Sequence, residues 1–240
     1  MTAMAGSGDE IVRLIDIRKT YITGELQVPV LKGIDATVTR GEFVGFIGTS
    51  GSGKSTLLNI LGMLDVPTSG HYFLEEMEVS RLSDVEQAVI RNRKIGFIFQ
   101  SFNLFSHLTI EQNIEVPMVY ARIPGRIRRA RALELARRVG LGHRLGHRPT
   151  QLSGGECQRI AIARALSNQP AFILADEPTG NLDEKTSDEI MKLFHELNRD
   201  QGVTIVMVTH NPLLAPHYDK IIRLRDGRIE HTPQEGVLVR

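Results

Sequence analysis

Residues 43–58 have the sequence FVGFIGTSGSGKSTLL, and this stretch decides the fold of the chain. Its centre has the spacing G-x-x-x-x-G-K-[ST], the pattern of a phosphate-binding P-loop. The apolar run before it predicts a buried strand, and the run from Thr56 to Leu61 predicts the start of a helix. Strand, loop and helix follow in the order that this motif requires, which argues against a chance glycine-rich turn. The predicted loop comprises Gly48, Thr49, Ser50, Gly51, Ser52, Gly53, Lys54, Ser55 and Thr56.

The chemistry of this loop suits a nucleoside triphosphate. Glycines let the backbone approach phosphate oxygens closely, and successive N–H groups form an anion-binding nest. The helix N-terminus adds partial positive charge. Lys54 can reach the β- and γ-phosphates, and the hydroxyl of Ser55 is a suitable ligand for Mg²⁺. The sequence therefore predicts a site for ATP and Mg²⁺.

Composition limits the class of protein. The chain has 240 residues, 41% of them hydrophobic, enough for one large domain or two small ones. A net charge of +1 gives no support for binding to nucleic acid. The single cysteine, Cys157, excludes an intramolecular disulfide and suits a reducing compartment. Because residues 1–10 lack a signal-peptide pattern and no apolar run approaches the ~20 residues of a spanning helix, we expect a cytoplasmic protein that reaches a membrane only through a partner.

Strands and helices alternate along the chain. A short apolar strand is expected at 94–100, and further strands at 172–175 and 203–208. Helical spacing is present at 126–139, 156–167 and 185–199, and Asp226-Gly227 predicts a hairpin turn. Short strands are also expected at 11–21 and 28–39. This alternation predicts an α/β fold with a parallel sheet and helices on both faces.

Polar residues follow several of the predicted buried strands. Gln100, Asp176-Glu177 and His210 each end an apolar run, as the P-loop does. Ligands bind at the carboxyl ends of the strands in such sheets, so these features should converge on one edge. We assign Asp176 to the metal and Glu177 to the general base that orients the attacking water. From the residues alone, Gln100 is either a ligand of Mg²⁺ or water or a loop residue, and His210 either contacts a γ-phosphate or caps a turn.

A second anion site is indicated by Leu152-Ser153-Gly154-Gly155-Glu156, which precedes the predicted helix at 156–167. One chain should not need two sites for a γ-phosphate. The simplest interpretation is that the second site serves the nucleotide of another protomer, so that a head-to-tail dimer encloses two ATP molecules. The alternative is a glycine-rich helix cap without a ligand.

Taken together, these motifs resemble, in order and spacing, those of an ABC-transporter nucleotide-binding subunit. The resemblance covers residues 11–229 and rests on the P-loop, Gln100, the Leu-Ser-Gly-Gly signature at 152–155, the run 172–177, Asp183 and His210. It implies a RecA-like P-loop NTPase core with an N-terminal antiparallel β subdomain and an inserted α-helical subdomain. The implied ATPase domain spans 11–230, with core segments 11–100 and 165–230, a helical subdomain at 101–164 and tails at 1–10 and 231–240.

The same resemblance implies roles for individual residues. Tyr21 would stack on adenine, Gln100 would be the Q-loop glutamine that senses Mg²⁺ and the permease, and His210 would be the switch histidine. Glu177 would be the catalytic glutamate. Ser153, Gly154 and Gly155 would bind the γ-phosphate of the opposite protomer, and Asp183 would close a D-loop across the dimer interface.

Three segments, 62–65, 99–104 and 176–183, further resemble the macrolide-export and lipoprotein-release group. This implies a homodimer of ATPase subunits at the cytoplasmic face of the membrane. The expected partner is a permease with few spanning helices and a large periplasmic domain, and a periplasmic adaptor is a further expected partner. Glu156 and Gly180-Asn181 depart from the broader superfamily but suit this group. The rival interpretation is an ABC-type ATPase that acts on nucleic acid or the ribosome, which usually carries insertions or a second cassette.

Two surface features complete the expectations. Apolar residues at 104–118 look exposed, and we assign part of this run to a groove for a permease coupling helix and part to the core of the helical subdomain. The arginines at 126, 128, 129, 131, 137 and 138 either form a solvated helix face or meet lipid headgroups.

Overall fold

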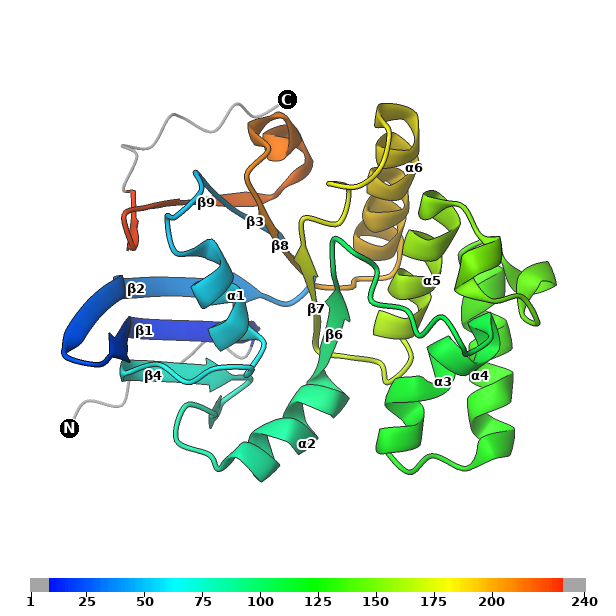
Figure 1. Ribbon diagram of the computed structural model, residues 1–240, viewed down its shortest axis with the longest axis horizontal. Coiled ribbons are helices and arrows are strands. Elements are labelled where there is room, and N and C mark those ends of the chain that lie inside the picture. Colours follow the sequence, from blue (N-terminus) through cyan, green and yellow to red (C-terminus); the bar gives the residue numbers. More distant parts are fainter. Residues whose placement is uncertain (1–8, 231–240) are drawn as a thin grey trace.

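The structure is a computed structural model that describes residues 9–230. The tails expected at 1–10 and 231–240 lie outside this range, apart from Asp9 and Glu10, and Glu10 already belongs to the first strand. Two sheets and a group of helices make up the described part (Figure 1). The α/β class, with an N-terminal antiparallel sheet and a helical insertion, is confirmed.

The first sheet is antiparallel, with the strand order β2-β1-β4-β5. The two strands expected to be short, at 11–21 and 28–39, are in fact 14 residues each and pair along their whole lengths. Bulges interrupt this pairing, and a strand that bulges breaks the strict alternation on which the shorter prediction relied. The bounds are β1 Glu10–Thr23, β2 Leu26–Thr39, β4 Ser69–Leu74 and β5 Met77–Glu78.

The second sheet has the order β10-β9-β3-β8-β7-β6, and its five strands from β9 to β6 run parallel. Each strand expected from an apolar run is present, with its ends shifted by no more than two residues. The bounds are β3 Phe43–Gly48, β6 Ile95–Ile98, β7 Phe172–Asp176, β8 Ile205–Thr209, β9 Lys220–Arg225 and β10 Arg228–Ile229.

The helices follow the expected order with two additions. The helices α2 and α3 were not predicted, because α2 buries only one residue and α3 contains Pro117. The helix expected at 185–199 ends at His195 and continues as a π-helical turn. The bounds are α1 Lys54–Leu61, α2 Asp84–Lys94, α3 Ile110–Tyr120, α4 Gly125–Arg138, α5 Gly154–Ala165 and α6 Glu184–His195, with short turns η1 Gly142–Arg144, η2 Pro149–Gln151, η3 Glu196–Asp200 and η4 Pro212–His217.

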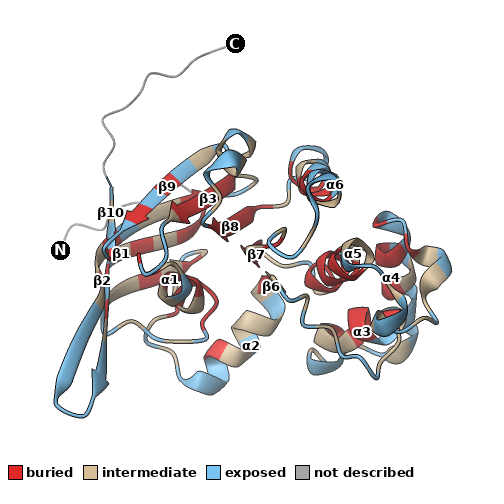
Figure 2. Ribbon diagram, turned by 45° about the horizontal axis from the view of Figure 1, so that its top comes forward, coloured by how far each residue is buried: buried red, intermediate tan, exposed pale blue. Residues whose placement is uncertain are grey.

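Two hydrophobic cores lie on opposite faces of the parallel sheet. Successive residues of β7 alternate between them: Phe172 and Leu174 join the core under α1 and the antiparallel sheet, whereas Ile173 and Ala175 join the core under α5 and α6. This alternation follows the period-2 geometry of a strand. Figure 2 shows the buried residues concentrated in the parallel sheet and on the inner sides of α5 and α4.

The structure divides the apolar run 104–118, which was expected to be part core and part partner groove. Ile110, Ile114 and Met118 are fully buried on one side of α3 and belong to the core. Phe105 is exposed and Val116 partly exposed. The reason is helical spacing, since residues four apart share one face. Only the remaining apolar side chains are therefore available to a partner.

Candidate active site

The P-loop connects β3 to α1 and forms a closed loop in this structure. Lys54 Nζ donates to the carbonyl oxygens of Gly48 and Thr49, at 2.8 Å each. A Cβ on Gly48 would lie 2.4 Å from the carbonyl oxygen of Leu224 and 2.5 Å from Ser52 Oγ, so position 48 tolerates only glycine. Helix α1 begins at Lys54, two residues earlier than expected, so Lys54 and Ser55 stand in its first turn. This places both side chains at the positive end of the helix.

The expected convergence of strand ends is confirmed by the strand register. Strands β3, β8, β7 and β6 are parallel neighbours, with Ile47 opposite Thr209 and Ile98 opposite Ala175. The segments after these strands begin with the P-loop, His210, Glu177 and the loop containing Gln100. One edge of the sheet therefore carries these four features.

Glu177 and His210 are in direct polar contact at this edge. The carboxylate of Glu177 lies 2.5 Å from Nδ1 of His210. Glu177 also has a φ of +44°, an uncommon conformation for a non-glycine residue, and its backbone N–H is held by the carbonyl oxygen of Val208 at 2.9 Å. The loop after β7 thus fixes the carboxylate beside the imidazole, while the His210 side chain remains exposed.

Asp176 is the other carboxylate at the end of β7. Burial and the neighbouring Glu177 raise the pKa of Asp176, and Lys54 partly opposes this shift. The approach of a cation would stabilise the ionised form. Among residues 9–230, no three His, Cys, Asp or Glu side chains are arranged to hold a metal by themselves. One carboxylate and the Ser55 hydroxyl fit Mg²⁺, which usually keeps waters and binds substrate phosphates alongside few protein ligands.

Gln100 is held by Asn181, the first residue of the run Asn181-Leu182-Asp183 that the resemblance assigned to the D-loop. Its Nε2 donates to Asn181 Oδ1 at 3.1 Å, and Asn181 Nδ2 donates back to the Gln100 carbonyl oxygen at 3.0 Å. A Cβ on Gly180 would lie 2.7 Å from Gln100 Nε2. The Gly180-Asn181 pair, which departs from the superfamily pattern, therefore provides both the space and the hydrogen bonds for Gln100.

The signature segment caps α5. Ser153 Oγ accepts from the backbone N–H of Glu156 at 3.2 Å, and Glu156 accepts from the backbone N–H of Ser153 at 2.8 Å. Ser153 and Gly154 are exposed. Helix α5 packs on α3, α4, α6 and β6, whereas α1 packs on β2, β3, β7 and β8. The helices that follow the P-loop and the signature, α1 and α5, thus pack on different faces of the sheet.

Three further residues near the site were missed as candidates. Asp183 caps α6 by accepting from the backbone N–H of Thr186 at 3.0 Å, a contact that its D-loop assignment did not predict. Gln158, Arg164 and Asp65 were given no role at the site. Gln158 is fully buried and donates to the Pro178 carbonyl oxygen at 2.7 Å. Arg164 donates to the carbonyl oxygens of Asn103 and Phe102. Such contacts join residues far apart in sequence, so no local pattern could reveal them.

Across the described residues, the helices are all too short or too polar to cross a lipid bilayer.

A nucleotide-binding P-loop, a strand-end carboxylate pair and a capped glycine signature define a P-loop ATPase. The model of the ABC transporter family matches residues 31–180, and the chain belongs to this family. It is an ATP-binding subunit of an ABC transporter, and as an enzyme it is an ABC ATPase.

Similar proteins agree with this assignment. An uncharacterised ABC transporter ATP-binding protein of Thermotoga maritima is 55% identical over 95% of this chain and 97% of its own length. The macrolide export ATP-binding/permease protein MacB of Syntrophobacter fumaroxidans is 51% identical over 95% of this chain, which spans 32% of that relative. The dimeric structure of the ATP-binding cassette MJ0796 bound to ADP and Pi has a TM-score of 0.82 and 45% identity, over 92% of this chain and 97% of that one.

Proposed function

We propose that this chain dimerises on ATP and drives a separate membrane permease from the cytoplasmic side, in efflux, lipoprotein release or mechanical transmission. The packing of α1 and α5, the helices after the P-loop and the signature, on different faces of the sheet carries this proposal. Each P-loop then needs the signature of a second copy to enclose its nucleotide. The dimeric structure of the MJ0796 cassette supports the dimer. The name of MacB, an ATP-binding/permease protein, supports the permease partner.

The geometry suggests how the site would work. Lys54 exchanges the carbonyl oxygens of Gly48 and Thr49 for the phosphates of ATP, which opens the loop to its substrate. Glu177 orients the attacking water for in-line displacement, and His210 holds this carboxylate in place. Tyr21 supports the adenine, and Ser153, Gly154 and Gly155 of the second copy would contact the γ-phosphate.

Mg²⁺ would be held by Ser55 and Asp176, with Gln100 as a further ligand. When bound, the ion would neutralise charge on the β- and γ-phosphates. The chain itself keeps Asp176 at the end of a buried strand and holds the Gln100 side chain on Asn181.

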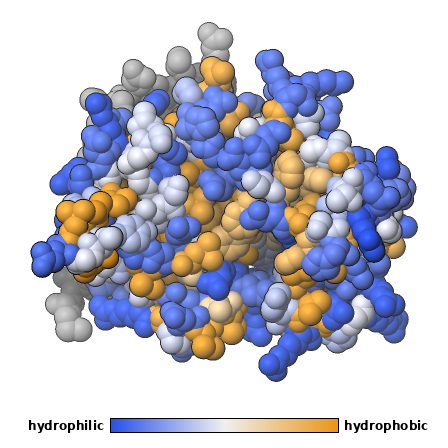
Figure 3. All heavy atoms as spheres, in the orientation of Figure 1, coloured by the Kyte–Doolittle hydropathy of each residue, from blue (hydrophilic) through white to orange (hydrophobic). Residues whose placement is uncertain are grey.

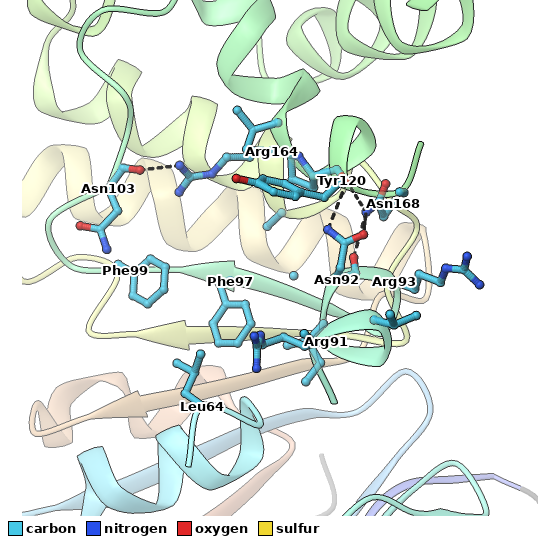
Figure 4. Close-up of a pocket in the computed structure, with 18 of the residues that line it drawn as sticks. Leu64, Arg91, Asn92, Arg93, Phe97, Phe99, Asn103, Tyr120, Arg164 and Asn168 are labelled. Carbon is cyan, nitrogen blue, oxygen red and sulfur yellow. Dashed lines mark hydrogen bonds between the residues drawn. The ribbon is translucent and has the colours of Figure 1, made fainter. Parts of the chain in front are cut away.

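The permease would dock in a hollow between α2 and the helical insertion. This cavity has a volume of about 1000 Å³, and its apolar lining includes Val85, Phe97, Phe105 and Tyr120. Figure 4 shows Phe97, Phe99 and Leu64 around the hollow, with Tyr120 and Arg164 on its other side. In Figure 3, hydrophobic side chains are exposed over the region of α2 and β6. A short amphipathic helix of a partner fits such a surface.

Glu177→Gln tests the hydrolytic step and the dimer together. The variant keeps the shape of the side chain but removes its negative charge, so turnover should fall by at least about 100-fold while ATP binding persists. With ATP and Mg²⁺, size-exclusion chromatography with light scattering should show a dimer that wild type forms only briefly. Hydrolysis at the wild-type rate would remove Glu177 from this role, and a monomer with ATP bound would contradict the dimer.

The same variant can identify the partner. Glu177→Gln loaded with ATP and Mg²⁺ should retain a permease with few spanning helices from detergent-solubilised native membranes. Ribosomal proteins or nucleic acid in its place would support the rival function. Lys54→Ala, which should not bind ATP tightly, is the control for retention that does not depend on nucleotide.

A further inference from the structure

The aromatic ring of Tyr21 is fixed by two side chains that no motif assigns to the site. Tyr21 Oη donates to Asp65 Oδ2 at 2.9 Å. Lys19 Nζ donates to the other oxygen, Asp65 Oδ1, at 2.6 Å, and lies 4.9 Å from the centre of the Tyr21 ring. A cation at this distance is attracted to the face of an aromatic ring. Tyr21 is thus held at its hydroxyl and over its ring.

The cluster of Lys19, Tyr21 and Asp65 is fixed by burial and by further hydrogen bonds. Lys19 is only 9% exposed, and its Nζ also donates to the Val66 carbonyl oxygen at 2.8 Å. Asp65 further accepts from the backbone N–H of Val66 at 2.8 Å. Partial burial alone would raise the pKa of Asp65, but the hydrogen bonds from Lys19, Tyr21 and Val66 outweigh it and lower the pKa. Asp65 therefore stays ionised at neutral pH and keeps accepting from both side chains.

The cluster is joined to the nucleotide site through α1 and β2. Helix α1 begins at Lys54, and the backbone N–H of Asp65 donates to the carbonyl oxygen of Asn59 within that helix. Tyr21 is paired with Val28 in the sheet, and the neighbouring Val30 and Leu31 approach Gly53 of the P-loop. Tyr21 is 38% exposed as a residue, while Lys19 lies over one face of its ring.

We propose that Asp65 is a positioning residue for nucleotide binding: it fixes the Tyr21 hydroxyl, with Lys19 against one ring face, so that the other face is set to receive the base of ATP. This inference rests on the proposed role of Tyr21. Because the ring is ordered before ATP arrives, the conformational entropy of ordering it does not reduce affinity. Asp65 belongs to the segment 62–65 that marked the subgroup, and this gives that segment a function.

Binding of two probes separates the base from the phosphates. MgATP and magnesium tripolyphosphate are titrated by calorimetry into wild type, Tyr21→Ala, Tyr21→Phe and Asp65→Ala. Loss of a stacked ring should weaken MgATP binding about 10-fold in Tyr21→Ala. Loss of the anchor alone should weaken it about 3-fold in both Tyr21→Phe and Asp65→Ala, with no additional loss in the double variant. Tripolyphosphate affinity should stay within about twofold of wild type throughout, since it has no base.

The outcomes distinguish the role of Tyr21 in binding the base from the role of Asp65 in positioning Tyr21. Asp16→Ala is the matched control. Asp16 is an exposed aspartate on β1, the strand that carries Tyr21, and it pairs with Arg18. MgATP affinity unchanged in Tyr21→Ala would overturn the role of Tyr21 and this inference with it. A loss in Tyr21→Ala alone, with wild-type affinity in Tyr21→Phe and Asp65→Ala, would overturn only the role of Asp65. An equal loss of tripolyphosphate affinity in Asp65→Ala would show that Asp65 acts through α1 instead.

Discussion

At the scale of single residues, Asp176 lowers the stability of the folded state while it serves the proposed Mg²⁺ site. The pKa of Asp176 is raised in the folded protein, first by burial and then by Glu177. A group of this kind stabilises the fold fully only below its unfolded pKa, and that contribution is lost as the pH rises through the folded pKa. At neutral pH the ionised side chain therefore weakens the fold, unless a cation compensates its charge.

Asp176→Asn should consequently be more stable than wild type and inactive. Without nucleotide or Mg²⁺ we expect the Tm at pH 7 to rise by about 2–4 °C, the size of a 1 kcal/mol change in a chain of this length. The difference should shrink towards about pH 4, where aspartates become protonated. Differential scanning calorimetry across pH, with the exposed Asp188→Asn as control, makes the comparison. A lower Tm at pH 7 would show that Asp176 is a structural residue.

The residues also show how far a sequence could predict the site. Lys54, Glu177 and His210 follow apolar runs in one parallel sheet, so their convergence on one edge followed from local patterns alone. The Gln100–Asn181 pair and the Asp65–Tyr21 contact join segments that are 81 and 44 positions apart, and Tyr21 itself lies in β1. These partners depend on how distant segments pack in the folded chain, and no spacing rule contains that information.

At the scale of elements, the contact of α5 with α6 depends on the second signature glycine. A Cβ on Gly155 would lie 2.6 Å from Cγ2 of Thr186, near the start of α6. Thr186 is itself held by Asp183, which accepts from its hydroxyl at 2.6 Å, so it cannot move freely. The glycine thus allows the signature helix to pack closely against the helix that follows the D-loop.

Gly155→Ala should therefore lower the free energy of unfolding by about 1–3 kcal/mol through overpacking. Thr186→Ser removes only the clashing methyl group and keeps the hydroxyl that bonds Asp183. In the double variant most of the lost stability should return, as measured by urea unfolding. Gly146→Ala is the control, because nothing lies within 4 Å of a Cβ there. Failure of Thr186→Ser to rescue Gly155→Ala would place the strain elsewhere.

Elements also differed in how well patterns predicted them. The apolar runs that became β3, β7 and β8 are buried on both faces and were predicted to within a few residues. Helix α2 leaves Val85 and Val89 exposed and buries only Gln87, so it has no buried apolar face by which hydrophobic periodicity could reveal it. Its capping box at Ser83 and Glu86 is the signal that could have indicated it.

At the scale of the whole molecule, the nucleotide site and the cavity for a partner share one loop. Gln100 lies at the sheet edge, and the two residues after Ser101, Phe102 and Asn103, both have positive φ values. Arg164 of α5 holds their carbonyl oxygens, and burial lowers the pKa of its guanidinium to about 10. Figure 4 shows Arg164 and Asn103 joined by this bond at the side of the cavity. Movement of the helical insertion would therefore be transmitted to Gln100.

This arrangement predicts that one surface substitution can abolish binding of the permease and leave basal ATP hydrolysis intact. Tyr120 lines the cavity and is 76% exposed, so Tyr120→Asp should fold normally and keep the basal ATPase rate within about twofold. A buried charge at the interface would cost several kcal/mol, so retention of the permease by the Tyr120→Asp form of Glu177→Gln should fall at least about 10-fold. Leu213→Asp is the matched control, because Leu213 is 80% exposed and does not line the cavity. Equal loss of the permease in both variants would show that the cavity is not the docking site, since any added surface charge would then have the same effect.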